Sequence, residues 1–198
     1  MRTFVATRNA GKLGELRAIF AGSILDLENY PAYREVDEVA SSYVGNALIK
    51  ARALSRQLFD SGIEAAAIAD DSGLEVDFLS GRPGVLSARY AGAETPWPGR
   101  REALLGELDG LAEAERTARF VCVMALLLPN EEPVASIGVV EGRIVSRERG
   151  GGGFGYDPLF LYPPSGCTFA ELSSEEKNAV SHRRRAANAL LATLHMRV

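Results

Sequence analysis

The chain has 198 residues, of which 46% are hydrophobic and 24% charged, so it can bury a core without disulfides or structural metals. Its formal net charge of −4 argues against the broad basic face that nucleic-acid binding requires, although a few local cations can still bind a small anion. No segment approaches the roughly 18 apolar residues of a membrane-spanning helix, so no membrane partner is expected. Cys122 and Cys167 lack metal-ligand spacing and are expected to be reduced thiols, and the N-terminus lacks a signal-peptide pattern, which together indicate a cytoplasmic protein.

The first part of the chain alternates between strand and helix patterns. Residues 3–6 are typical of a short buried strand, and apolar residues at helical spacing predict a helix over 12–20. A second helix is predicted over 46–60. Strands are expected over 65–69 and 74–78, separated by a polar turn.

The second part of the chain continues the mixture. A long apolar run predicts a strand over 119–128, and residues 134–145 are expected to form a hairpin that turns at Glu141-Gly142. Further helices are predicted over 99–109, after the capping-box sequence Ser173–Glu176, and over 183–195. Because strands and helices alternate without a strict βαβ rhythm, we expect an α/β fold with a mixed sheet flanked by helices.

A polar, cationic loop joins the first strand to the first helix. Thr7, Arg8, Asn9 and Lys12 offer the hydroxyl, amide and cationic groups that phosphate oxygens prefer, and a helix N-terminus adds N–H donors. The loop is not a Walker A motif, since Leu13 follows the lysine. It is therefore a candidate phosphate site, the alternative being an ordinary capped helix start with a solvated lysine.

Two adjacent carboxylates, Asp70 and Asp71, follow the strand predicted over 65–69. Adjacent strand residues point to opposite faces, and at a strand end one acid can face a ligand while the other meets backbone donors. Such a carboxylate can hold Mg²⁺ or orient a water molecule. The alternative is a pair of acids in an ordinary turn, although ligands do gather at strand ends in α/β folds.

A glycine-rich segment over 150–158 contains two aromatic residues and an acid. Glycines permit close backbone approach, and the ring of Phe154 or Tyr156 could stack on a nucleobase. Asp157 could accept a hydrogen bond from a purine N–H. The alternative is a flexible loop with packed aromatics. Trp97, between two prolines, is expected in a loop or at an interface.

Hydrogen-bond donors gather near the last predicted helix. Lys177 and Asn178 are followed by Ser181, His182 and Arg183, a set that suits a keto oxygen or a phosphate. The alternative is a basic, solvated helix terminus.

Taken in order, six segments resemble the inosine triphosphate pyrophosphatase family, the non-canonical purine nucleoside triphosphate pyrophosphatases. Each segment is weak evidence alone, but six in the same order across nearly the whole chain are specific. The segments are Thr7-x-Asn9-x-Gly11-Lys12, Asn46-Ala47-x-x-Lys50-Ala51, Ala69 to Leu74, Gly84 to Gly92, Gly153 to Pro158, and Glu171-Leu172 through Lys177 to Ser181-His182-Arg183.

The resemblance implies a single domain over 1–198, with two lobes around a long mixed sheet and the active site in the cleft. It also implies a homodimer that hydrolyses dITP, ITP and XTP to monophosphate and pyrophosphate with Mg²⁺, which cleans the nucleotide pool. By resemblance, Asp71 is the catalytic acid and a metal ligand, and Phe154 stacks on the purine. The substrate-binding residues implied are Thr7, Arg8, Asn9, Ala10, Gly11 and Lys12 for the triphosphate, with Ser72, and Phe154, Gly155, Tyr156, Asp157, Lys177, His182 and Arg183 for the base.

One position departs from the family pattern. The family's usual Glu-Asn-Ala reads Gly45-Asn46-Ala47 here, and that glutamate is commonly a metal ligand. We hypothesise that Glu38, together with Asp71, sustains Mg²⁺ binding. The alternatives are a nucleotide-binding homologue with impaired catalysis and a pyrophosphatase for pyrimidine or methylated nucleotides.

Overall fold

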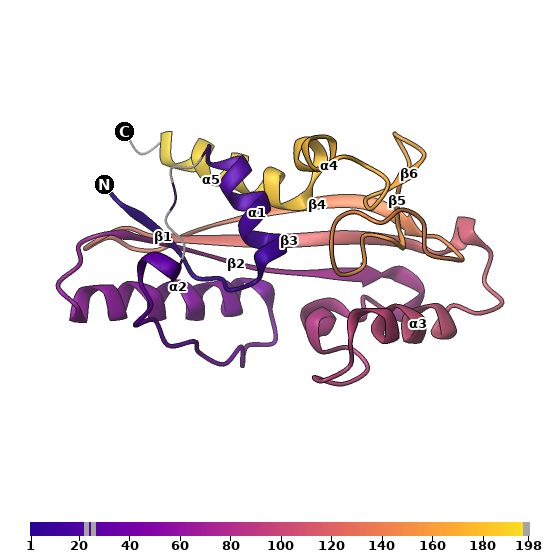
Figure 1. The fold of residues 1–198 in the computed structure, drawn as a ribbon, viewed down its shortest axis with the longest axis horizontal. Helices are drawn as coiled ribbons and strands as arrows, with labels where there is room; N and C mark the ends of the chain where they lie inside the picture. Colours follow the sequence, from indigo (N-terminus) through magenta and orange to yellow (C-terminus); the bar gives the residue numbers. More distant parts are fainter. Residues whose placement is uncertain (22–23, 25–26, 196–198) are drawn as a thin grey trace. The chain divides into compact units, whose positions relative to one another are not determined.

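The computed structural model describes residues 1–21, 24 and 27–195. These residues form a six-stranded sheet in the order β1-β2-β3-β4-β5-β6 (Figure 1). β1 runs parallel to β2, whereas β5 runs antiparallel to both β4 and β6, so the sheet is mixed. The strands are β1 (Thr3–Val5), β2 (Ala66–Val76), β3 (Thr117–Leu127), β4 (Val134–Ile144), β5 (Phe160–Tyr162) and β6 (Cys167–Thr168). The helices are α1 (Ala10–Ile19), α2 (Tyr43–Asp60), α3 (Trp97–Glu107), α4 (Ser174–Val180) and α5 (His182–His195). The expected α/β class is confirmed.

The chain divides into two compact units. The first comprises Met1–Asp71, Cys122–Gly138 and the segment from His182 onward, and the second comprises Ser72–Val121 and Val139–Ser181. β2, β3 and β4 each contribute residues to both units.

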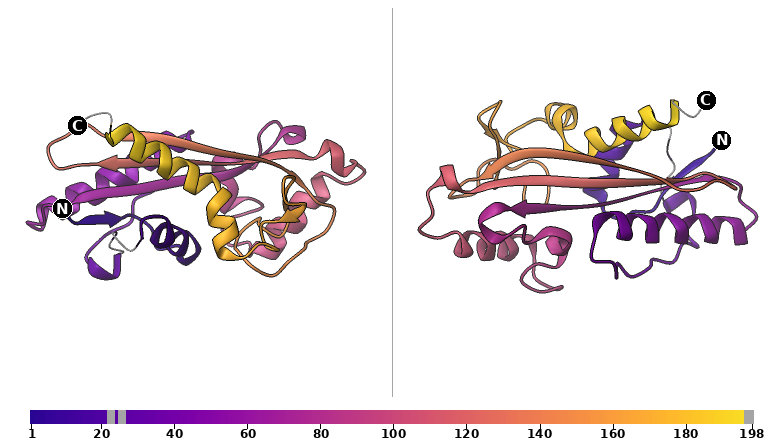
Figure 2. Two further views of the ribbon diagram at one scale, coloured as in Figure 1. Left: turned by 90° about the horizontal axis from the view of Figure 1, so that it is seen from above. Right: turned by 180° about the vertical axis from the view of Figure 1, so that it is seen from behind.

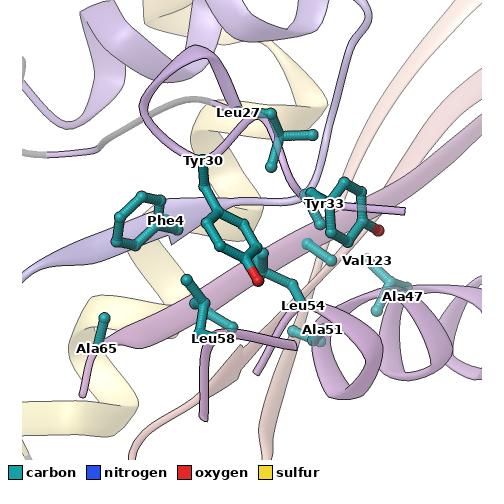
Figure 3. Close-up of a cluster of buried hydrophobic side chains, with 14 residues drawn as sticks. Phe4, Leu27, Tyr30, Tyr33, Ala47, Ala51, Leu54, Leu58, Ala65 and Val123 are labelled. Carbon is teal, nitrogen blue, oxygen red and sulfur yellow. The ribbon is translucent and has the colours of Figure 1, made fainter. Parts of the chain in front are cut away.

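In the first unit, successive residues of β2 pack against different helices, as strand geometry requires. Ala67 and Ala69 belong to the apolar cluster that contains Leu54 and Leu58 of α2, part of which Figure 3 shows. Ile68 belongs to a second cluster, built with residues of α1 and α5. α2 therefore covers one face of these strands and α1 and α5 the other (Figures 1 and 2).

In the second unit, α3 packs through Leu104 on the apolar residues of β2 and β4. Three rings extend this core: Phe120 lies 4.5 Å from Phe160 between ring centroids, and Phe160 lies 5.0 Å from Phe169. The short helix α4 begins at the capping box of Ser173 and Glu176, as its sequence predicted.

Two predicted turns are wrong. β2 runs without a break through Asp70, Asp71 and Ser72, so the acids lie inside a strand and not at its end. β4 is a single strand, and Gly142 lies within it. A Cβ on Gly142 would lie 2.5 Å from both the carbonyl oxygen of Leu161 and the ring of Phe160, so this glycine permits close packing and not a turn.

The predicted helices are all present, with shifted ends. α2 begins three residues before its predicted start, and α3 begins at Trp97, which was expected in a loop or at an interface. No helix among residues 1–21, 24 and 27–195 has the length and apolar character to cross a bilayer.

Candidate active site

The carboxylates of Asp70 and Asp71 point to opposite faces of β2. Asp70 lies two residues after Ile68, so it points to the same face of β2 and meets residues of α1 and α5. Asp71 lies two residues after Ala69, so it points to the opposite face and meets residues of α2. Each acid therefore has a separate set of partners, all of them within the first unit.

Asp70 is the centre of a buried ion-pair network. Its Oδ2 atom lies 3.1 Å from Nζ of Lys12 and 3.2 Å from a guanidinium nitrogen of Arg183, and the acid is 1% exposed. Arg183 is also fully buried and donates to Glu15 of α1. Burial alone would raise the pKa of Asp70, but the charges of Lys12 and Arg183 outweigh it and hold this pKa well below its usual range.

The loop that precedes α1 is ordered by its own polar side chains. The side chain of Asn9 accepts a hydrogen bond from the Lys12 N–H at 3.0 Å and caps the helix, and the Thr7 hydroxyl accepts one from the Asn9 N–H. Arg8 donates to the carbonyl oxygen of Tyr33 at 3.1 Å. The helix start and the Lys12 ammonium are thereby fixed on the side of β2 that carries Asp70.

Asp71 has two partners on α2, one helical turn apart. Asn46 donates through Nδ2 to the Asp71 carboxylate at 3.1 Å, and Lys50 places its ammonium 3.6 Å from Asp71 Oδ1. The same ammonium lies 2.6 Å from Oε1 of Glu38. Burial raises the pKa of Asp71 in spite of the Lys50 charge, and Glu38 adds to the rise.

This donor set fits a hydrated divalent cation that also binds phosphate. Asp71 and Glu38 already share one cation, the Lys50 ammonium, so both carboxylates face the same position. Mg²⁺ usually takes one or two protein carboxylates and completes its shell with water and substrate oxygens. Among the described residues no cluster holds three or more histidine, cysteine or acidic ligands, so a metal here would need such additional oxygens.

Gly45 lies in the first turn of α2, at the position where the resemblance led us to expect glutamate. A Cβ at this position would lie 2.5 Å from the Cβ of Ala40 and 3.1 Å from the hydroxyl of Ser42. Ala40 is held in place because its N–H donates to the Asn46 side chain at 2.9 Å. The glycine therefore lets the segment that carries Glu38 pack directly on the start of α2.

The glycine-rich segment of the second unit forms a tight turn around Asp157. The Asp157 carboxylate accepts hydrogen bonds from the Phe154 N–H at 2.7 Å and from the Lys177 ammonium. The Lys177 ammonium also lies 4.5 Å from the centroid of the Phe154 ring. Gly153 has φ +67°, and a Cβ there would lie 2.1 Å from the Asp157 carboxylate, so the turn requires glycine.

The structure thus gathers the predicted residues into three groups, two in the first unit and one in the second. Asp71 and Glu38 meet at the Lys50 ammonium in the first unit. Lys12 and Arg183 meet at Asp70 in the first unit, where His182 is buried at the start of α5. Phe154, Asp157 and Lys177 are in contact in the second unit. The remaining predicted residues, Ala10, Gly11, Ser72, Gly155 and Tyr156, lie in the segments that carry these groups.

A family model described as the Ham1 family matches residues 3–193. The chain belongs to the Ham1 family. The resemblance found from the six motif segments is therefore confirmed.

Relatives with known names or structures align over almost their full length. The chain is 44% identical over 192 residues to a dITP/XTP pyrophosphatase of Shouchella clausii, covering 96% of this chain and 94% of the relative. It is 46% identical over 188 residues to a dITP/XTP pyrophosphatase of Geobacter sulfurreducens, covering 93% and 92%. The Ham1 protein of Staphylococcus aureus superposes with a TM-score of 0.86 at 37% identity, covering 100% of both chains.

The sequence did not predict three residues that contact the site residues, namely Asn46, Lys50 and Glu15. Asn46 and Lys50 were quoted only as motif residues, although their spacing of four on a predicted helix places them on one face. Glu15 lies three residues after Lys12 on α1 and is buried against Arg183, and it gave no signal beyond this helical spacing.

Proposed function

We propose that this chain hydrolyses the triphosphates of non-canonical purine nucleosides (dITP, ITP and XTP) to the monophosphate and pyrophosphate. The observation that carries the proposal is a buried carboxylate, Asp71, that shares a cation with Glu38. It is supported by close similarity to proteins named dITP/XTP pyrophosphatase along more than nine-tenths of the chain. The homologous span of 3–193 supports a single catalytic domain.

The phosphates are proposed to bind the segment of Thr7, Arg8, Asn9, Ala10, Gly11 and Lys12. An ammonium and the N-terminal end of α1 attract phosphate oxygens, and Asn9 and Thr7 order the segment before substrate arrives. Asp70 holds the Lys12 side chain, which is only 17% exposed, in a fixed position. This arrangement lowers the conformational cost of binding a triphosphate.

Asp71 is proposed as the catalytic acid, with Glu38 as its partner in holding Mg²⁺. When bound there, Mg²⁺ would neutralise charge on the phosphates during attack at the α-phosphorus. Asp71 would orient the attacking water molecule and accept its proton, and burial, which raises its pKa, makes its carboxylate a stronger base than an exposed aspartate. Ser72 follows in β2 and is proposed to contact the substrate.

The base is proposed to bind the turn of Phe154, Gly155, Tyr156 and Asp157, with Phe154 stacked on the purine. The donors of Lys177, His182 and Arg183 are proposed to face the 6-keto oxygen of hypoxanthine or xanthine. A 6-amino group would leave such donors unpaired, so adenine is penalised. For Arg183, the contacts to Asp70 and Glu15 additionally support a role in holding Asp70.

The alternative of a nucleotide-binding protein with impaired catalysis depends on Gly45 alone. The packing at Gly45 opposes this alternative. Gly45 accommodates the segment that brings Glu38 to Lys50 and Asp71, and Glu38 is the carboxylate proposed to replace the missing glutamate. Among the residues that the structure describes, no contact favours specificity for a pyrimidine or a methylated nucleotide. A homodimer, a cytoplasmic location and a role in cleaning the nucleotide pool remain parts of the proposal.

The deciding experiment measures pyrophosphate release from dITP at alkaline pH, with dGTP and dATP assayed separately as control substrates and with Mg²⁺ or EDTA. Mg²⁺-dependent turnover of dITP, with little turnover of dATP and dGTP, is expected. Asp71→Asn serves as the inactive control, and Asp60→Asn, at the exposed end of α2, is the matched active control. Binding of dITP without turnover would establish the impaired homologue instead.

A further inference from the structure

Trp97, which belongs to none of the six motif segments, lies directly against the turn proposed to bind the base. A Cβ built on Gly155 would lie 3.5 Å from Cη2 and 3.6 Å from Cζ3 of the indole. Gly155 has φ +63°, a conformation that suits glycine. A side chain at this position would thus meet the indole at van der Waals distance, so the turn lies close beside the ring.

Arg101, four residues later on α3, holds the same glycine through a hydrogen bond. Its guanidinium donates to the Gly155 carbonyl oxygen at 2.9 Å and to Oε1 of Glu148 at 2.8 Å. The Arg101 side chain is only 13% exposed, so this contact is partly shielded from water. One face of α3 thus meets the turn with a ring and a charged donor.

The indole is itself held on several sides. Pro96 and Pro98 restrict the backbone at the start of α3, which limits the orientations open to Trp97. The guanidinium of Arg100 lies 4.9 Å from the indole centroid, and the Tyr156 ring meets the indole edge-on at 5.3 Å. Trp97 is therefore a firm support and not a mobile surface ring.

We propose that Trp97 and Arg101 are positioning residues that fix the Gly153–Asp157 turn for the purine. Within the turn, Asp157 ties down Phe154, while Gly155 gains its support from α3. Glycine otherwise has the greatest backbone freedom, and binding would have to restrict it. This inference rests on the proposed function, and it assigns part of the affinity for the base to α3.

The test compares dITP kinetics of Trp97→Ala, Trp97→Phe and Arg101→Gln with the unmodified enzyme. Trp97→Ala and Arg101→Gln are expected to raise KM for dITP about tenfold while kcat falls less than about threefold. Trp97→Phe keeps a ring at the start of α3, so its KM for dITP is expected to lie between those of the unmodified enzyme and Trp97→Ala. Inhibition by inorganic tripolyphosphate, which lacks a base, should be unchanged in all three. Phe78→Ala removes an exposed aromatic ring in the same unit and is the matched control.

A binding measurement separates positioning from turnover. Trp97 is the sole tryptophan of the chain, so its fluorescence reports directly on the turn. Addition of inosine monophosphate is expected to change the emission of the unmodified protein. Arg101→Gln should raise the Kd for inosine monophosphate about tenfold.

The outcomes distinguish this inference from the proposed function. An unmodified protein that neither binds nor hydrolyses dITP would refute the proposed function. An active protein in which Trp97→Phe and Arg101→Gln both keep the original KM, and in which Arg101→Gln also keeps the original Kd, would refute the positioning role alone. Should Trp97→Ala fail to fold by circular dichroism, these two milder variants decide the matter.

Discussion

Asp70 and Asp71 are neighbours in β2, yet each carboxylate contacts a different lysine on a different face of the strand. Asp70 lies 3.1 Å from the Lys12 ammonium, and Asp71 lies 3.6 Å from the Lys50 ammonium. One acid therefore completes a buried ion-pair network, and the other belongs to the proposed catalytic centre. Removing their charges one at a time should give opposite patterns of stability and activity.

Asp70→Asn is expected to destabilise the fold by about 3–5 kcal/mol at pH 7, because it leaves buried Arg183 without one of its carboxylates. The folded pKa of Asp70 lies below the unfolded value of 3.8, since Lys12 and Arg183 outweigh burial. Its stabilisation is thus fully present above that pH and is lost as the pH falls through the folded pKa. Urea unfolding between pH 7 and about pH 2 should show the gap between the two proteins narrowing once the pH falls below 3.8. A gap that stays constant with pH would contradict the prediction.

Asp71→Asn is expected to abolish most turnover, by a factor of about 10²–10⁴, with little loss of stability. Burial raises the pKa of Asp71 in the folded protein, so ionising this group costs more free energy there than in the unfolded chain. The stability that Asp71 contributes is present below its unfolded pKa and is lost as the pH rises through its folded pKa. Replacing Asp71 with neutral asparagine should therefore cost little stability at pH 7. Parallel assays of dITP turnover and urea unfolding test this, and a strongly destabilised variant would be the adverse result.

Glu38→Gln is expected to raise the Mg²⁺ concentration for half-maximal turnover at least about tenfold. The reason is the shared position of Glu38 and Asp71 around the Lys50 ammonium. Titrating Mg²⁺ at saturating dITP measures the effect, and Asp37→Asn makes the same chemical change on the adjacent exposed residue. An unchanged Mg²⁺ requirement would end the role assigned to Glu38.

Gly45→Ala is expected to lower the free energy of unfolding by about 1–3 kcal/mol, since its Cβ would overlap that of Ala40. Ala40→Gly removes the opposing methyl group, so the double variant should regain most of the loss. A double-mutant cycle by urea unfolding measures this coupling. Equal losses in the single Gly45→Ala and double variants would show that the close contact is not the cause.

The elements missed from the sequence have physical causes that only the folded chain reveals. Asp70, Asp71 and Gly142 all favour turns over strands, and each is accommodated by a tertiary contact. Lys12, Arg183 and Lys50 neutralise the two acids, and the Phe160 ring occupies the space beside Gly142. By contrast, the helices and the Ser173 capping box depend on local pattern and were predictable.

The site shows the same division between local and tertiary signals. The polar composition of the loop before α1 made it a candidate phosphate site, and its ordering by the Asn9 cap is a local contact. The pairing of Arg183 with Asp70 joins residues 113 positions apart, so no local pattern contains it. The role of Trp97 likewise depends on Gly155, which lies 58 residues later in the chain (155 − 97).

The continuous course of β2 determines which part of the molecule can open locally. Asp70 and Asp71 lie in the middle of β2 and are only 1% and 4% exposed, so they can meet solvent only if this part of the strand is displaced. Amide protons at Asp70 and Asp71 should therefore exchange with solvent only in rare, large openings. Those of exposed Arg8 and Asn9 should exchange far sooner. The two acids therefore stay in place on β2, whereas the segment proposed to bind phosphate is the part that meets solvent first.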